Sequence, residues 1–508
     1  MAELLQSVLN TLDDQSAGAA AEGIHQPVQS FLNYIDGKWM PCQSGRTFNN
    51  TNPADTSEVI GKFQASGPAD AEAAVSAAEK AFTAWRTLAI GKRAKILNDA
   101  ALYLEQNADQ FAEELTREEG KAFSQAKDEF LRSAQTFRFY ATEAQTYGGE
   151  TYPQDDPNMH VFSHREPLGV VTVISPWNFP ASIPARKLAP ALMTGNTVVF
   201  KPSSDAPLSG LRLVEALDKA GLPPGVVNCV TGRAGDVGPV ITTSNTIRAI
   251  SFTGSTSAGA LIHRSVHLTT RLQMELGGKN PLIVMEDADI DLAVDLAIKG
   301  GFSLTGQACT GTSRILVVPA VRQVFTEKLL KRVAALKIGS GMTPGMDLGP
   351  LATEKQLQTV LDYIAIGRTE ARLLCGGERL SGPEYDRGYY VSPAVFTDVT
   401  NDMRIAQEEI FGPVLAIIEV ADFDDALEKA NDTEYGLSAA IVTMNPRYMH
   451  RFTNEIQAGT VKINRTTTGN LVNAPFGGLK HSSTSTFRES GRAGLEFFTH
   501  IKTVYRGV

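Results

Sequence analysis

The run Val170-Val171-Thr172-Val173-Ile174 is short and rich in β-branched residues, as is Thr197-Val198-Val199-Phe200. Two more runs of this kind follow at residues 226–230 and 249–252, and helical or turn-forming sequence separates each run from the next. Short apolar strands that alternate with helical stretches are typical of βαβ units. This stretch therefore predicts an α/β lobe built on a parallel sheet.

A second series of the same kind follows the first. Its strands and helices are expected at residues 281–285, 314–318, 321–336, 354–366 and 414–418. We therefore expect two doubly wound parallel-sheet lobes, which a length of 508 residues also favours. The lobes join near Leu276-Gly277-Gly278, where the glycines predict a loose hinge.

Two segments with strand-like character, 160–164 and 499–505, belong to neither lobe, and a helical region at 70–147 precedes the first series. The predicted organisation has four parts: an N-terminal extension at 1–26, a first lobe at 27–150 and 169–276, a second lobe at 277–480, and a small β arm at 151–168 and 481–508.

Composition excludes several classes of function. A net charge of −9 argues against nucleic-acid binding, which needs clustered Lys and Arg. No apolar run reaches the roughly 18 residues that a membrane span requires. The four cysteines are scattered, without the spacing of a metal site or a disulfide framework. No Lys or Arg precedes Lys38, whereas secretory and mitochondrial signals need early positive charge. We expect a cytoplasmic protein without a metal.

Cys309 lies among small residues in Gly306-Gln307-Ala308-Cys309-Thr310-Gly311, and Glu275 lies 34 residues upstream beside the glycine pair. A thiolate can add to an electrophilic carbon, and a mobile carboxylate can activate the water that releases the adduct. A single Cys is more often a small buried hydrophobe. The assignment of Cys309 as a nucleophile on an open, flexible turn therefore depends on its neighbouring motifs.

Four such motifs accompany the Glu275 and Cys309 blocks: Ile174-Ser175-Pro176-Trp177-Asn178-Phe179-Pro180, Lys201-Pro202-Ser203-Ser204, Phe252-Thr253-Gly254-Ser255-Thr256 and Glu408-Glu409-Ile410-Phe411-Gly412-Pro413-Val414. In this order they identify the chain as a member of the aldehyde dehydrogenase superfamily, over residues 33–505. It most resembles the 2-oxoglutarate-semialdehyde and succinate-semialdehyde dehydrogenases. The resemblance implies a Rossmann-like first lobe that binds NAD or NADP and a catalytic second lobe. It also implies an arm that completes a neighbouring subunit's sheet in a homodimer or homotetramer.

The resemblance implies three catalytic residues. Cys309 would attack the aldehyde, Asn178 and the Cys309 backbone N–H would stabilise the oxyanion, and Glu275 would activate the water that hydrolyses the thioester. Members that transfer the acyl group to coenzyme A lack a glutamate at this place, so Glu275 favours hydrolysis. A catalytically inactive homologue would be expected to have lost one of the three. Taken alone, a buried Asn more often fixes a loop.

The same resemblance implies nine cofactor-binding residues: Pro176, Trp177, Lys201, Ser204, Gly254, Ser255, Leu276, Glu409 and Phe411. Lys201 directly follows a strand, where open parallel sheets place ligands, although on its own it could be a solvated lysine. Gly254-Ser255 opens a helix whose N-terminus suits a phosphate, or it is simply a helix cap. Ser204 stands where strict NAD users often carry a Glu, which favours NADP or use of both cofactors.

The substrate is expected to be an aldehyde with an anionic far end. Arg186 stands where succinate-semialdehyde dehydrogenases carry a substrate arginine, but Ser303 replaces their second one. The block around Arg465 resembles the 2-oxoglutarate-semialdehyde dehydrogenases, and Phe179 would line the substrate tunnel. Arginine is the preferred partner of a carboxylate, although each arginine could instead form a structural ion pair. We expect 2-oxoglutarate semialdehyde, with succinate semialdehyde or another acidic or sulfonated aldehyde as alternatives.

Overall fold

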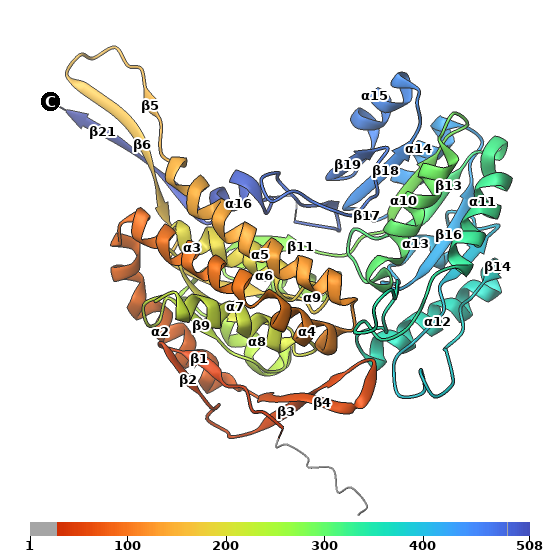
Figure 1. Cartoon of the computed structure of the whole chain (residues 1–508). Helices are drawn as coiled ribbons and strands as arrows, with labels where there is room; N and C mark the ends of the chain where they lie inside the picture. The colour runs from red at the N-terminus through yellow and green to blue at the C-terminus, as the bar shows by residue number, and fades with distance from the viewer. Residues whose placement is uncertain (1–27, 485, 508) are drawn as a thin grey trace, which may run out of the picture.

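The computed structural model describes residues 28–484 and 486–507. It contains two lobes, each built on a seven-stranded sheet, and an arm that projects from the first lobe (Figure 1). Both sheets are predominantly parallel, in agreement with the expected fold class. The N-terminal extension predicted at 1–26 lies outside the described residues.

The first sheet has the strand order β11-β10-β7-β8-β9-β1-β2. Its strands are β7 (Val170–Ile174), β8 (Thr197–Lys201), β9 (Val227–Cys229), β10 (Ile247–Thr253), β11 (Arg271–Glu275), β1 (Asn33–Ile35) and β2 (Lys38–Met40). The first five are parallel, whereas β1 joins β9 in the antiparallel sense. Because both faces of a parallel sheet are covered by helices, its central strands β7 and β8 are mainly apolar and buried.

Two apolar clusters cover the two faces of this sheet. One holds the helices α3 (Ile90–Gln106), α4 (Ala108–Glu119), α5 (Phe123–Glu143), α6 (Ser182–Met193) and α7 (Pro207–Lys219). The other holds α2 (Pro68–Thr87) and α8 (Ala234–Thr243). The helical region predicted at 70–147 is thus mainly four helices, α2 to α5, because Leu88, Asn107 and Gly120 end the first three.

The second sheet has the order β14-β15-β16-β13-β12-β18-β19. Its strands are β12 (Asn280–Val284), β13 (Thr312–Val317), β14 (Arg372–Cys375), β15 (Ala394–Thr397), β16 (Val414–Glu419), β18 (Ser438–Val442) and β19 (Thr460–Ile463). Around it lie α10 (Ile290–Phe302), α11 (Pro319–Ala334), α12 (Glu354–Glu370), α13 (Arg404–Gln407), α14 (Phe423–Asn431) and α15 (Pro446–Glu455). A single large apolar cluster fills this lobe.

The arm is an antiparallel sheet of β5 (Thr151–Tyr152), β6 (Met159–Pro167) and β21 (Thr499–Gly507), which follows α16 (Gly491–Phe497). In Figure 1 it extends well beyond the first lobe. The sequence did not predict the hairpin of β3 (Thr47–Asn52) and β4 (Asp55–Gln64), which runs beneath the first lobe toward the second. At its tip the carbonyl of Pro53 accepts a hydrogen bond from the Tyr389 N–H at 3.0 Å.

The chain passes from one sheet to the other between Glu275 and Asn280. Neither Gly277 nor Gly278 has a positive φ. A β carbon on Gly278 would lie 2.6 Å from the carbonyl oxygen of Cys309, and one on Gly277 would overlap the carboxylate of Glu409. The structure thus gives these glycines a packing role in place of the loose hinge expected from the sequence.

Two absences concern the described residues. None of their helices is both long enough and apolar enough to span a bilayer. Within the same residues, no group of His, Cys, Asp or Glu side chains is placed to hold a metal ion.

Candidate active site

Two cavities meet at Cys309, between the lobes. The first has a volume of about 250 Å³ and the second about 490 Å³. Ile183, Thr253 and Cys309 line both. A thiol at the junction of two cavities can face one ligand in each of them.

The loop before Cys309 is strained and held in place. It follows the short helix η2 (Ser303–Gly306), in which Leu304, Thr305 and Gly306 all have positive φ. Two consecutive non-glycine residues in the left-handed region are costly and persist only when their surroundings impose them. Here Asn280 Nδ2 donates to the carbonyls of Cys309 and Gly311, both at 2.9 Å. The loop is therefore anchored, whereas the sequence suggested a flexible turn.

Cys309 is half-buried, and its surroundings favour the neutral thiol over the thiolate. Burial raises its pKa to about 12, with Arg186 opposing and Glu409, Glu275 and Glu489 adding to the shift. The thiol must therefore lose its proton during attack. The nearby acidic groups account for part of the raised pKa, and Arg186 is the cation that favours the thiolate.

Glu275, the last residue of β11, lines the first cavity and is almost fully buried. Among the described residues, neither of its carboxyl oxygens has a hydrogen-bond partner. Burial raises its pKa well above the usual range, and the charge of Glu489 raises it further. Gly477 leaves room for this carboxyl, because a β carbon there would lie 2.6 Å from Oε1. Glu275 is thus a carboxyl free to move and to exchange a proton.

Glu489 supplies the opposite case in the same cavity. Its carboxylate accepts from Lys187 Nζ at 3.0 Å and lies 3.1 Å from Arg186 Nη1. Burial alone would raise the pKa of Glu489, but Lys187 and Arg186 outweigh it and hold the pKa below the usual range. The sequence motif around Glu489 was noticed, but nothing in it indicated this buried ion-pair cluster.

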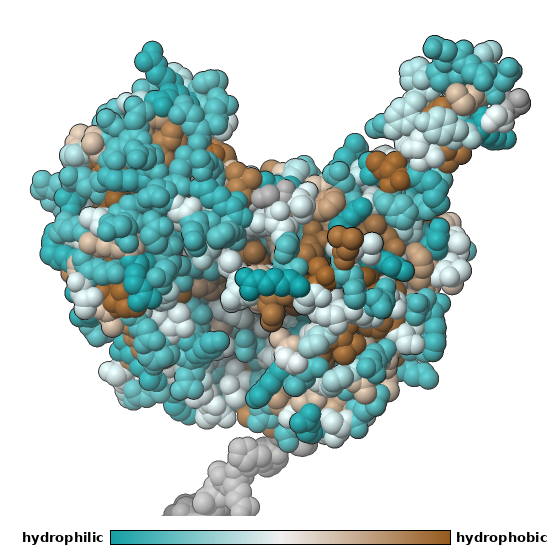
Figure 2. Space-filling model, turned by 180° about the vertical axis from the view of Figure 1, so that it is seen from behind, coloured by the Kyte–Doolittle hydropathy of each residue, from teal (hydrophilic) through white to brown (hydrophobic). Residues whose placement is uncertain are grey.

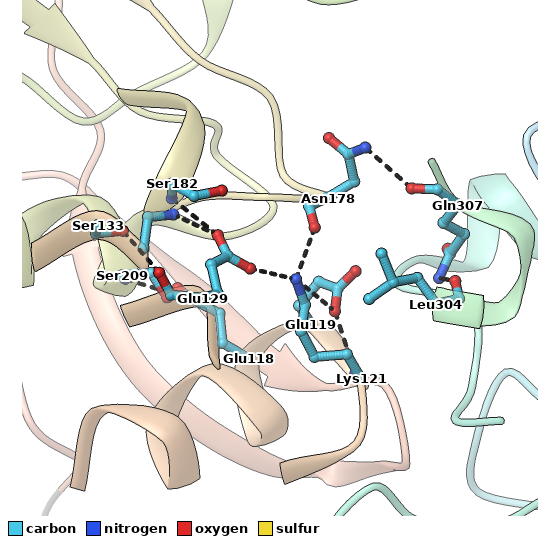
Figure 3. A network of polar contacts seen from close by, with 11 residues as sticks. Glu118, Glu119, Lys121, Glu129, Ser133, Asn178, Ser182, Ser209, Leu304 and Gln307 are labelled. Atoms are coloured by element: carbon cyan, nitrogen blue, oxygen red, sulfur yellow. Dashed lines mark hydrogen bonds and ion pairs between the residues drawn. The ribbon is translucent and has the colours of Figure 1, made fainter. Parts of the chain in front are cut away.

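Asn178 reaches toward the Cys309 loop from the opposite lobe. Its Nδ2 donates to the Gln307 carbonyl at 2.9 Å, two residues before Cys309 (Figure 3). The backbone carbonyl of Asn178 accepts a hydrogen bond from the buried ammonium of Lys121 at 2.7 Å. An amide NH₂ has two donors, so one N–H remains for a ligand. Sequence reasoning missed Lys121, which no motif marked.

The first cavity includes two of the three residues predicted to touch substrate, Phe179 and Arg186, together with Ser303. Arg465 is exposed and is not among the described residues that line this cavity. The neighbouring turn at 468–472 lines the cavity instead, and the structure does not bring Arg465 to it. A further cation, Arg132 on α5, lines the cavity, and no ion pair within the described residues engages it. Its signal in the sequence was only a position on a helix face shared with Gln125, Asp128 and Thr136.

The second cavity is lined by all nine residues that the sequence predicted to bind cofactor. Lys201 is buried, and within the part of the chain that the structure describes its Nζ donates only to the Pro202 carbonyl, at 3.1 Å. Burial lowers its pKa to about 8. Ser204 Oγ donates to the Gly232 carbonyl at 2.7 Å, so its proton is already engaged. Asp205, which the sequence analysis passed over, lines the cavity beside them.

The rest of this cavity has a polar and an aromatic wall. Ser255 caps α9 (Thr256–Ser265) by accepting from the Ala258 N–H at 3.3 Å. Glu409 Oε1 accepts from the Gly278 N–H at 3.0 Å, and burial raises the pKa of Glu409 to about 7. The rings of Trp177 and Phe411 meet edge to face at 5.5 Å.

Comparison with known proteins identifies the family. Residues 39–504 match the model of the aldehyde dehydrogenase family. The chain is 44% identical to an alpha-ketoglutaric semialdehyde dehydrogenase of Bacillus subtilis (strain 168), over 94% of this chain and 98% of that one. It is 43% identical to a 2,5-dioxopentanoate dehydrogenase of Saccharolobus solfataricus, over 94% and 100%.

Solved structures agree with this assignment. A point variant of betaine aldehyde dehydrogenase of Staphylococcus aureus, in complex with NAD+, superposes with a TM-score of 0.91 at 33% identity. The match covers 94% of this chain and 96% of that one. An NADP-dependent enzyme of E. coli gives 0.90 at 35% identity, over 95% and 98%. The chain therefore belongs to the aldehyde dehydrogenase family and is an NAD(P)-dependent aldehyde dehydrogenase.

Proposed function

We propose that this enzyme oxidises 2-oxoglutarate semialdehyde to the dicarboxylate through a thioester on Cys309, with hydrolytic release. The observation that carries the proposal is the position of Cys309 at the junction of two cavities. One cavity holds two arginines and a buried carboxyl that has no hydrogen-bond partner among the described residues, and the other is lined by the nine residues expected to bind the dinucleotide. The names of the relatives support the choice of substrate.

The residues of the second cavity fit NAD or NADP. Two buried hydroxyls there, Ser175 Oγ and Thr253 Oγ1, have no partner within the described chain and can accept a ligand. Lys201 and Ser204 would hold the adenosine ribose, Gly254 and Ser255 the pyrophosphate, and Glu409 the nicotinamide ribose. Pro176, Trp177, Leu276 and Phe411 supply the apolar walls. When bound, the dinucleotide accepts the hydride from the substrate carbon. Because Ser204 brings no carboxylate, we propose NADP or dual use.

The protein residues perform the remaining steps. The Cys309 sulfur bonds to the aldehyde carbon as the thiol proton passes to water, and the carbonyl π bond breaks so that its oxygen becomes an oxyanion. Asn178 Nδ2 and the Cys309 backbone N–H donate to that oxygen. One such donor lowers the activation free energy by about 2.7–4 kcal/mol. Loss of hydride from the carbon then gives the thioester.

Glu275 completes the cycle. Its carboxylate takes a proton from water, whose oxygen attacks the thioester carbon, and the C–S bond breaks to release the carboxylic acid and Cys309. A raised pKa makes this carboxylate a better base near neutral pH than an ordinary Glu. Because water is the acyl acceptor, coenzyme A is not required.

Arg186 and Arg132 would recognise the far carboxylate of the substrate. Arg186 already pairs with Glu489 through Nη1, and within the described residues its Nη2 atom has no hydrogen-bond or ion-pair partner. Arg132 lies in the more exposed part of the same cavity. Phe179 contributes an apolar wall. Succinate semialdehyde, or another acidic or sulfonated aldehyde, is the second candidate, because it offers the same charge to the same arginines.

We also propose a homodimer or homotetramer in the reducing cytoplasm. The arm leaves an edge of β21 open, and Ile501 and Tyr505 expose more than half of their surface there. Figure 2 shows further apolar surface on the first lobe, on the side from which the arm projects. All four cysteines are free. Light scattering would distinguish the oligomers from a monomer.

The test is a substrate panel. We expect the highest kcat/KM for 2-oxoglutarate semialdehyde, a lower value for succinate semialdehyde and the lowest for a neutral aldehyde of similar length. NAD and NADP are compared in parallel, with and without coenzyme A. Cys309→Ala should bind either dinucleotide but give no turnover. A preference for the neutral aldehyde would overturn the substrate proposal, and formation of an acyl-coenzyme A would overturn hydrolysis.

A further inference from the structure

Lys121 is a buried lysine that the proposed mechanism does not use. It follows Gly120, whose left-handed backbone (φ +99°) ends α4 and turns the chain inward. A fully buried ammonium is costly unless hydrogen bonds and opposite charges compensate it. The groups that surround Lys121 therefore indicate what this residue does.

The ammonium of Lys121 lies among hydrogen-bond acceptors and one aromatic ring. It donates to Glu129 Oε2 at 2.6 Å and to the backbone carbonyl of Asn178 at 2.7 Å (Figure 3). It also lies 4.8 Å from the ring centre of Phe179. The other oxygen of Glu129 accepts from the N–H groups of Ala181 and Ser182 at 2.9 and 3.0 Å. The Lys121–Glu129 ion pair is thus hydrogen-bonded to the backbone of residues 178–182, the segment that carries Asn178.

The charges of this cluster balance. Glu119 lies 3.7 Å from the ammonium, and its other carboxyl oxygen has no partner in the described structure. Burial raises the pKa of Glu119 to about 8, which favours its neutral form over the carboxylate. One cation then faces one anion, Glu129, and the pair can stay charged in a buried place.

The backbone around Lys121 also contacts the lobe that carries Cys309. Gly341 accepts from the Phe123 N–H at 3.0 Å, and Gly349 accepts from Thr305 Oγ1 at 2.9 Å. A β carbon on either glycine would overlap the carbonyl of Gly120 or Lys121. The backbone at residues 120–121 thus packs closely against the second lobe, and Asn178 of the first lobe donates a hydrogen bond to Gln307 of the second.

We infer that Lys121 is a positioning residue for the reaction: through the Asn178 carbonyl it fixes the amide that donates to the oxyanion. The inference rests on the role given to Asn178 under the proposed function. A misplacement of about 1 Å in such a group can slow a reaction about a hundred-fold. Loss of Lys121 should therefore slow the steps that build an oxyanion and leave the reactivity of the thiol itself unchanged.

Two reagents separate these effects. 4-Nitrophenyl acetate acylates a thiol through a tetrahedral oxyanion, whereas iodoacetamide alkylates it by displacement, without an oxyanion. Both rates are followed on the Cys309 peptide by mass spectrometry. We expect Lys121→Met to slow acylation about ten- to a hundred-fold with alkylation unchanged. Lys121→Arg should recover part of the acylation rate, because its guanidinium can donate to the same carbonyl.

Matched variants complete the experiment. Glu118→Gln changes a carboxyl that is equally buried but binds the Leu208 N–H and Ser209 instead, so it should lower Tm without changing either rate. If Lys121→Met fails to fold, Lys121→Met with Glu129→Gln removes both charges and leaves no unpaired ion. Unchanged acylation, or equal losses of acylation and alkylation, would overturn the inference.

Asn178→Ala separates this inference from the proposed function. If Asn178→Ala slows acylation and Lys121→Met does not, only the inference about Lys121 fails. If Asn178→Ala leaves acylation unchanged, the oxyanion role of Asn178 fails, and the inference about Lys121 fails with it.

Discussion

Glu275 and Glu489 line the same cavity, yet their surroundings shift their pKa values in opposite directions. Glu489 is held ionised by Lys187 and Arg186, whereas Glu275 has no partner among the described residues and feels the charge of Glu489. Pairs of carboxyls treated in this way are characteristic of acid–base chemistry. The pair leads directly to a pH dependence.

Glu489→Gln should move the ascending limb of the kcat–pH profile to lower pH. Glu275 works as a base only when ionised, so activity rises as pH passes through its pKa. Removing the charge of Glu489 takes away one cause of the raised pKa, and the cations that remain lower the pKa further. Arg488→Met removes a cation that lowers the pKa of Glu275, so its limb should move to higher pH. Shifts of both variants in one direction would contradict this account.

Glu275→Gln should allow the thioester to form but slow its hydrolysis, because an amide cannot take a proton from water. Stopped-flow absorbance should show a burst of reduced dinucleotide near one per active site, followed by slow turnover. Gly477→Ala should weaken the same step, since the new β carbon would lie 2.6 Å from Glu275 Oε1. Normal steady-state rates in Glu275→Gln would mean that another group is the base.

Replacing Arg186 or Arg132 with Ala should raise KM for an anionic semialdehyde. A hydrogen bond to a charged group contributes about 1.5–3 kcal/mol, roughly ten- to a hundred-fold in affinity. Arg132 is exposed, so solvent screening should reduce its effect to about a few-fold. Asp128→Asn, which removes an anion from the same cavity, should lower KM.

Arg465→Ala is the matched control, because Arg465 is an exposed arginine away from the cavity. Its KM should match that of the unmodified enzyme. A neutral aldehyde of similar length tests for loss of packing, since it has no charge to recognise. Equal losses on the neutral and anionic aldehydes would show that Arg186 and Arg132 are structural.

Ser204→Glu should shift preference toward NAD, because its carboxylate would repel a 2'-phosphate and accept from a 2'-hydroxyl. Ser204 lines the second cavity, and its hydroxyl already donates a hydrogen bond to the Gly232 carbonyl. The measurement is kcat/KM with each cofactor in both proteins. Asp205→Asn removes the neighbouring carboxylate and should move the ratio toward NADP. A ratio that does not move in Ser204→Glu would place the adenosine ribose elsewhere.

Local sequence determined the elements and the motifs. Apolar β-branched runs such as 170–174 and 281–285 are strands because their side chains are buried on both faces of a parallel sheet, so their composition alone marks them. The motifs around Cys309, Glu275 and Asn178 could likewise be read as a set, since each is contiguous in the chain. The hairpin of β3 and β4 carried no such signal, because β3 is polar and burial does not alternate regularly along β4.

Tertiary structure decided which side chains meet in the site, because those contacts join residues far apart in the sequence. The ion pairs of Arg186 and Lys187 with Glu489 join residues about 300 positions apart, and no local pattern encodes that distance. The same reason explains why Arg465 was expected in the cavity and Arg132 was not. It also explains Lys121: a lone lysine after a glycine looks solvated, and only the folded chain surrounds it with Glu129 and the Asn178 carbonyl. The sequence determined which groups can react, and the packing of the two lobes decided which of them meet.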